Sequence, residues 1–245
     1  MNTIAALGWE LRRILLTRTY LYSLLLIMLL SQNILGRLII HGIYGAAPYA
    51  QVNYAHFLTM MNAMLLTVLM LWCAGVFSEK ERAVRRIVLS TPLTSAGYLG
   101  LKTAAIAAAF LLTAGLMVAG SFVFYVRQFG FYAFHEFLNP LAVFVLPSAI
   151  FILGLSLAAG QLHARLPYGL IPVVFFLGVV NLKNLPQWLD LSGNGYMFHY
   201  PTILMRTLGT GEMVYYLPPS FLATRAVLAL AGVALLFWAA RHRCH

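Results

Sequence analysis

Long apolar segments alternate with short polar ones along most of this chain. Six of the apolar segments come close to the length of about 20 residues that a helix needs to cross the hydrocarbon core of a bilayer. The predicted spans are Tyr20–Ile40, Phe57–Phe77, Thr103–Val126, Pro140–Leu162, Tyr168–Leu182 and Ala223–Ala240. The fifth span is short for a full crossing. The pattern therefore predicts an all-α integral membrane protein with six transmembrane helices.

Composition agrees with this class. Apolar residues make up 62% of the chain, charged residues make up 9%, and the mean hydropathy is +0.85, whereas about a quarter of the residues in a typical soluble domain are charged. The six spans leave no room for a separate soluble domain of ordinary size. We therefore expect residues 1–245 to form a single transmembrane domain.

The distribution of Lys and Arg predicts the orientation. With six spans and an inner N-terminus, eleven of the sixteen basic residues lie on the inner side and five lie outside or at the outer interface. Cytoplasmic loops are the ones enriched in Lys and Arg, so we expect both termini inside. The net charge of +10 then has a topological cause and does not indicate a nucleic-acid partner.

Residues 1–19 are expected to form an amphipathic helix in the inner interface. Ile4, Leu7, Leu11 and Ile14 recur at helical spacing, with polar residues such as Glu10 and Arg13 on the other side. No small-residue cleavage pattern follows the first apolar segment, so we expect no cleaved signal peptide. The alternative is a charged flank that only sets the topology.

The sequence lacks the patterns of the common catalytic sites. All six acidic residues fall in predicted loops or interfaces, so no pair of carboxylates is expected inside the membrane for acid–base chemistry or ion coupling. The seven histidines are scattered, and no phosphate-binding loop, zinc-protease motif or nucleophile elbow is present. We expect no catalytic residues and no metal or cofactor in this chain, and any ATP that drives it must bind to another chain.

Residues 78–102 form the most charged connection between two spans. Glu79-Lys80-Glu81-Arg82 extends the second helix into water, and Val84, Ile87 and Val88 then form an apolar edge flanked by Arg85 and Arg86. Such an edge suits the groove of a partner. Thr91-Pro92 ends this helix, and Thr94 or Ser95 can begin a short helix before Lys102 opens the third span. The alternative is a loop that serves only as a topology determinant.

This order of elements resembles the permease subunits of ATP-binding-cassette transporters of the type-2 exporter class. The resemblance comprises Trp9-Glu10-Leu11-Arg12-Arg13 in the N-terminal helix, Glu79-Lys80-Glu81-Arg82 after two spans, Leu89-Ser90-Thr91-Pro92-Leu93-Thr94, and Lys102 at the third span. The specific part covers about 25 residues. Ala83-Val84 stand where the family commonly has Gly-Thr.

The resemblance implies a cytoplasmic coupling helix within residues 78–102 that touches a soluble ATPase. The implied contact residues are Glu79, Glu81, Arg82, Val88, Leu89, Pro92 and Leu93. Two soluble ATPase subunits, which hold the ATP and Mg, and a second permease, identical or paralogous, are the implied partners, together with membrane lipids. The implied location is the bacterial cytoplasmic (inner) membrane.

Residues 183–222 combine many Gly and Pro residues with an unusual number of apolar and aromatic ones. We expect short re-entrant helices here, on the outer side before the sixth span, because similar permeases have such helices. Trp188, Tyr196, Phe198 and Tyr200 are candidates for an outer gate. An aromatic belt that only anchors the domain is an equal alternative.

Spans that carry no charged residue away from their ends favour an amphipathic or apolar cargo, such as a lipid, a peptide or a drug-like molecule, over a small ion. The function predicted from the sequence is therefore the membrane subunit of an ATP-driven exporter. Two alternatives remain open at this stage: a membrane protein that binds a toxin or lipid without transport, and a membrane-embedded enzyme.

Overall fold

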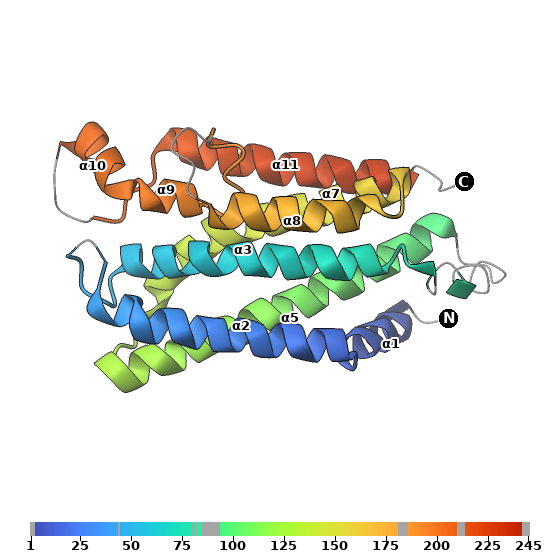
Figure 1. Ribbon diagram of the computed structural model, residues 1–245, viewed down its shortest axis with the longest axis horizontal. Helices are drawn as coiled ribbons and strands as arrows, with labels where there is room; N and C mark the ends of the chain where they lie inside the picture. The colour runs from blue at the N-terminus through green and yellow to red at the C-terminus, as the bar shows by residue number, and fades with distance from the viewer. Residues whose placement is uncertain are drawn as a thin grey trace.

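The computed structural model describes residues 3–43, 45–79, 81, 83–84, 94–180, 186–209 and 214–241. In these ranges the chain is helical, with short connections and no β-strand. The helices lie roughly along one long axis (Figure 1), with α1 and the end of α11 at one end of the molecule and α9 and α10 at the other. The predicted all-α class is confirmed.

Helix α1 (Thr3–Leu15) is separate from α2 (Arg18–Arg37). The Thr17 hydroxyl accepts a hydrogen bond from the Tyr20 amide at 3.1 Å, which satisfies one of the free amides at the start of α2. Leu11 and Ile14 of α1 pack against the core, whereas Trp9 is 75% exposed. The N-terminal segment therefore forms a helix with one buried and one open face. The predicted division of faces is wrong for Glu10 and Arg13, because both side chains turn toward the bundle, where they meet charged partners.

Five helical segments are long and apolar enough to cross a membrane. They are α2 with the short η1 (Ile39–His41), α3 (Gln51–Gly75), α5 (Ser95–Phe129), the run of η2 (Phe134–Phe137), α6 (Leu138–Pro140), η3 (Leu141–Val145) and α7 (Leu146–Leu162), and α11 (Pro219–Arg241). Helix α8 (Leu166–Val179), at the predicted fifth span, has 14 residues. At 1.5 Å per residue it is about 21 Å long, shorter than the hydrocarbon core of about 30 Å.

One predicted boundary is wrong. The short helix expected from Thr94 through Leu99 and the third span expected from Thr103 form a single helix, α5, of 35 residues. The Thr94 hydroxyl caps it by accepting a hydrogen bond from the Gly97 amide at 3.1 Å. No proline follows Thr94 in this segment, and Gly100 alone does not end the helix. Because 35 residues span about 52 Å, α5 exceeds the thickness of the hydrocarbon core by several turns.

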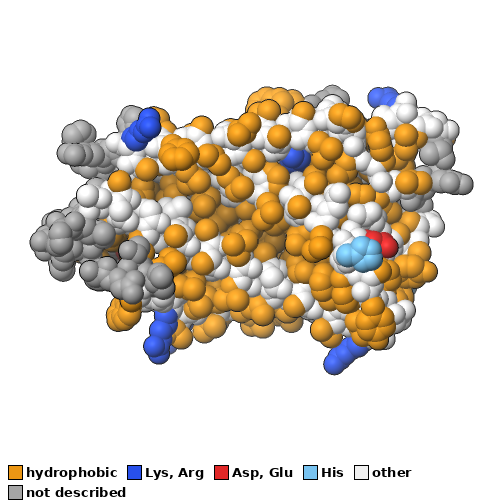
Figure 2. Space-filling model, turned by 180° about the vertical axis from the view of Figure 1, so that it is seen from behind, with side chains coloured by type: hydrophobic (Ala, Val, Ile, Leu, Met, Phe, Trp, Pro, Cys, Tyr) orange, Lys and Arg blue, Asp and Glu red, His pale blue; other side chains and the backbone are white. Residues whose placement is uncertain are grey.

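Helix α3 is the centre of the bundle. It has the largest buried share, 78%, among the five membrane-length segments, compared with 28% for α2 and 22% for α11. Hydrophobic side chains cover most of the middle of the face seen in Figure 2, and most of the Lys and Arg side chains visible there lie near its two ends. An apolar middle between charged ends is the surface that a bilayer requires.

Glycines allow two pairs of helices to approach closely. A side chain on Gly154 of α7 would meet the Gly232 carbonyl oxygen of α11 at 2.3 Å, and one on Gly178 of α8 would meet the Ala63 side chain of α3 at 2.7 Å. Small residues at such crossings are typical of membrane helix pairs, in which packing drives association.

Candidate functional site

Lys102, near the start of α5, is a buried cation held by two carboxylates. Its side chain is 3% exposed, and its Nζ lies 2.7 Å from Glu10 Oε2 and 2.9 Å from Glu81 Oε2. Glu10 belongs to α1, and Glu81 follows the end of α3. The ammonium therefore joins three segments that are far apart in the sequence.

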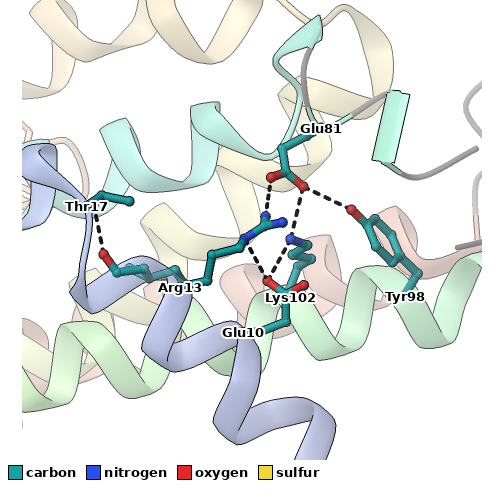
Figure 3. Close-up of polar contacts among 7 residues, drawn as sticks. Glu10, Arg13, Thr17, Glu81, Tyr98 and Lys102 are labelled. Atoms are coloured by element: carbon teal, nitrogen blue, oxygen red, sulfur yellow. Dashed lines mark hydrogen bonds and ion pairs between the residues drawn. The ribbon is translucent and has the colours of Figure 1, made fainter. Parts of the chain in front are cut away.

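Two further side chains close this group (Figure 3). The Arg13 guanidinium pairs with Glu81 and also lies 3.4 Å from Glu10 Oε2, and the Tyr98 hydroxyl donates to Glu81 Oε2 at 3.0 Å. We call Glu10, Arg13, Glu81, Tyr98 and Lys102 the Lys102 cluster. Its two cations and two carboxylates give it no net charge.

The cluster holds Glu81 in its ionised form. Burial alone would raise the pKa of the Glu81 carboxyl, but the hydrogen bond and charge of Lys102, the charge of Arg13 and the Tyr98 hydroxyl outweigh it and lower the pKa below its ordinary value of 4.5. The carboxylate is therefore charged at neutral pH, in agreement with its contacts to Arg13, Lys102 and Tyr98.

A cavity of about 230 Å³ lies beside the cluster. Glu10, Arg13, Glu81 and Lys102 form its polar side, together with Thr17 and Thr19 at the start of α2. Its apolar side consists of Ile14, Leu71, Trp72, Val76 and Ile106, and Gly75 completes the lining. The cavity thus has a charged side and an apolar side.

The structure describes two of the seven expected ATPase-contact residues. Glu79 is exposed, and Glu81 belongs to the Lys102 cluster. Arg82, Val88, Leu89, Pro92 and Leu93 lie outside the described residues. Their proposed contact with an ATPase stays a prediction.

Sequence reasoning missed the role of Glu10, Arg13 and Tyr98. Glu10 and Arg13 are three residues apart on one face of α1, and Lys102 is the single cation at the start of the third span. The spacing of Glu10 and Arg13 and the position of Lys102 were visible in the sequence, but nothing in the sequence showed that Glu81 lies between α1 and α5. Only the packing of α1 against α5 does so.

The four candidates for an outer gate fall into two kinds. Trp188 and Phe198 are 60% and 51% exposed. Tyr200 is fully buried, and its hydroxyl accepts from the Tyr216 amide and donates to the Val214 carbonyl, both at 2.6 Å. Tyr196 stacks on Phe221 of α11 with ring centroids 4.0 Å apart. The two tyrosines therefore hold α9 and α10 against the residues before and at the start of α11, and of the four candidates only Trp188 and Phe198 are open to a ligand.

The segment that contains Asp190 lies deep in the bundle. The Ser192 carbonyl accepts a hydrogen bond at 3.2 Å from Asn62, which is near the middle of α3. The Ser192 hydroxyl donates to the Gly178 carbonyl at the end of α8 at 3.1 Å. Residues 190–194 thus lie within the helix bundle beyond the end of α8, where a longer helix would have continued.

Asp190 and Arg225 are both buried, at 5% and 2% exposure. The Asp190 carboxylate accepts from the Gly193 amide at 2.9 Å and the Tyr196 amide at 2.8 Å, so it caps α9 (Asn194–Phe198). Arg225 of α11 donates to the Asp190 and Leu191 carbonyls at 2.8 and 3.1 Å. Asp190 is in a connection, as the sequence predicts, but that connection is buried.

These contacts give Asp190 a structural role. Each of its oxygens accepts a backbone amide, so the carboxylate holds the start of α9 in place. Among the described residues, no group of three or more His, Cys, Asp or Glu side chains could hold a metal ion.

The fold and these sites define a multi-pass α-helical membrane protein with a charge-neutral polar cluster at one end and a buried polar segment toward the other. Comparison of the chain with protein-family models, with curated proteins and with solved structures found no match.

Proposed function

We propose that this chain is the membrane-spanning permease subunit of an ATP-driven exporter, with ATP hydrolysed by a separate soluble subunit. The observation that carries the proposal is the Lys102 cluster. Three of the four stretches on which the family resemblance rests, those around Glu10, Glu81 and Lys102, contact one another through it.

The cluster gives the charged connection a mechanical role. Glu81 forms ion pairs with Arg13 of α1 and with Lys102 of α5. A displacement of the connection formed by residues 78–94 would therefore be transmitted to both helices. Helix α5 is longer than the bilayer is thick, and its first two turns carry Tyr98 and Lys102. An ATPase that favours one position of this unit by a few kcal/mol would shift the permease between two arrangements.

The proposed topology has six spans, with α8 as the short fifth one and both termini in the cytoplasm. Residues 190–194 and helices α9 and α10 (Tyr200–Leu208) complete the outer half of that crossing. The proposed location is the bacterial cytoplasmic membrane.

The partners proposed are two soluble ATPase subunits and a second permease. The α2 and α11 helices, which are the least buried of the five membrane-length segments, supply apolar faces for that second copy or for lipid. The proposed cargo is amphipathic or apolar, because the buried Asp190 and Arg225 are already bonded to backbone and leave no open charged pathway among the described residues.

Co-purification with native neighbours tests this proposal. We expect a soluble ATPase to elute with the tagged wild-type chain in mild detergent, and Glu81→Gln to lower the vanadate-sensitive ATPase activity of the complex about tenfold, which corresponds to a coupling of about 1.4 kcal/mol. Glu136→Gln is the matched control, because Glu136 is exposed and belongs neither to residues 78–102 nor to the Lys102 cluster. If no ATPase associates with the wild type, the chain is not an exporter subunit of this kind.

A further inference from the structure

We propose that the cavity beside the Lys102 cluster binds the headgroup of a zwitterionic phospholipid that carries a primary ammonium. This inference goes beyond the proposed function and depends only on the chain crossing a membrane. It concerns a lipid held at one end of the helix bundle, whatever the protein transports.

The position of the cavity favours a lipid. Its charged side is at the end of the bundle where α1 and the start of α5 lie, and its apolar side is formed by Leu71 and Trp72 of α3 and Ile106 of α5. Leu71 is exposed, so this wall continues toward the lipid-facing surface. A headgroup in the cavity can therefore keep its acyl chains in the bilayer.

The size of the cavity favours a headgroup over a whole molecule. Sites for drug-sized ligands usually have volumes of about 300–1,000 Å³, and this cavity has about 230 Å³. A headgroup with its glycerol fits such a volume, and the acyl chains need no enclosed space.

The charges of the cavity select the headgroup. Arg13 is the more exposed cation, with a side chain that is 36% exposed, and it can bind a phosphate while it keeps one carboxylate. Glu10 and Glu81, at 16% and 17% exposure, can accept hydrogen bonds from an ammonium. A ligand with one charge of each sign preserves the neutrality of the cluster, whereas an anionic lipid would leave an unpaired negative charge beside two carboxylates.

Trp72 adds a second observation. It is 8% exposed, and its indole N–H has no hydrogen-bond partner among the described residues. Buried indole N–H groups usually have a partner. A lipid phosphate or ester oxygen in the cavity that Trp72 lines would supply an acceptor after a small movement of the ring.

Gly75 offers a way to fill the cavity without damage to the fold. It lines the cavity, and a β-carbon added there would meet no atom of another part of the described structure within 4 Å. Gly75→Leu should therefore occupy the headgroup site. Gly100→Leu is the matched control, because Gly100 is also in open space at this end of the bundle but does not line the cavity.

The test is native mass spectrometry of the detergent-purified chain, delipidated and then offered equal amounts of phosphatidylethanolamine, phosphatidylcholine and phosphatidylglycerol. We expect phosphatidylethanolamine to be retained at least about tenfold more than the other two by the wild type and by Gly100→Leu, and Gly75→Leu to lose this preference. Free glycerophosphoethanolamine should compete weakly, because it lacks the acyl chains.

Three results would overturn the proposal: equal retention of the three lipids by the wild type, a preference for phosphatidylglycerol, or an unchanged preference in Gly75→Leu. Competition by the free headgroup as strong as by the lipid would indicate a soluble ligand. Thr19→Phe fills the cavity from α2 and repeats the test if Gly75→Leu does not fold, since Thr19 is exposed and its side chain makes no hydrogen bond that the fold uses.

Discussion

Lys102 joins α1, α5 and the segment after α3 through a single side chain. It is the cation that Glu10 and Glu81 share, and it is nearly inaccessible to solvent. Two carboxylates that face each other without it would repel, and each would lose its strongest partner. Removal of one member of a buried ion pair costs more than the pair contributes, because the remaining charge stays in a poor environment.

Lys102→Met should therefore lower the free energy of unfolding by about 2–3 kcal/mol, somewhat less than for a fully buried pair because both carboxylates keep some solvent contact. Unfolding by SDS in mixed micelles measures this change. The double variant Lys102→Met with Glu81→Gln should recover part of the loss, and an equal or larger loss in the double variant would contradict the pairing.

The lowered pKa of Glu81 also predicts a pH dependence. A carboxyl whose pKa is lower in the folded state stabilises the protein above its unfolded value of 4.5, and this contribution is lost as the pH falls through the folded pKa. The melting temperature of the wild type should fall more steeply below pH 4.5 than that of Glu81→Gln. Parallel curves for the two proteins would show that Glu81 is not held as described.

At the scale of helices, the sequence predicted more of the fold than of the contacts between its parts. Hydropathy alone places α2 and α11 and the ends of α3 and α7 within a few residues, because each crossing must be apolar along its length. The starts predicted for α3 and α7 are each six residues away from the observed ones. Hydropathy misplaced the start of α5, since a helix that continues beyond the membrane needs no apolar residues there. The short fifth span and the unusual composition of residues 183–222 were visible, but the link from Ser192 to Asn62 was not, because it depends on tertiary packing.

The crossing of α7 and α11 gives a direct test at this scale. Gly154→Leu places a side chain against the Gly232 carbonyl oxygen, at a point where the backbones meet, and should cost at least about 2 kcal/mol of stability. Gly115→Leu is the control, because Gly115 of α5 is exposed and has no atom within 4 Å of its added side chain. A similar loss of stability in both variants would show that the loss does not come from the close approach of α7 and α11.

For the molecule as a whole, the orientation in the membrane is the property that the function most depends on. The proposed contact with an ATPase requires the Lys102 cluster to lie in the cytoplasm, and the Lys and Arg counts predict that orientation. Tyr132, after α5, is 72% exposed and should face outward, while the exposed Thr94 before α5 should face inward.

Single cysteines at these two positions, with Cys73 and Cys244 replaced by Ala, measure the orientation. In intact cells, a membrane-impermeant maleimide should label Tyr132→Cys, and should label Thr94→Cys only after the membrane is opened. The reverse pattern would place the Lys102 cluster outside and remove the basis for contact with a cytoplasmic ATPase.

The sequence separation within the Lys102 cluster has a consequence for biosynthesis. Glu10 is made 92 residues before Lys102, an interval of about 5–20 s at ordinary rates of translation. During this time α1 has emerged from the ribosome while its main charged partner has not been synthesised. We therefore expect α1 to remain at the membrane surface until the helix that begins at Ser95 is inserted. Docking of α1 onto α5 is then a late step of assembly, although α1 is the first helix synthesised.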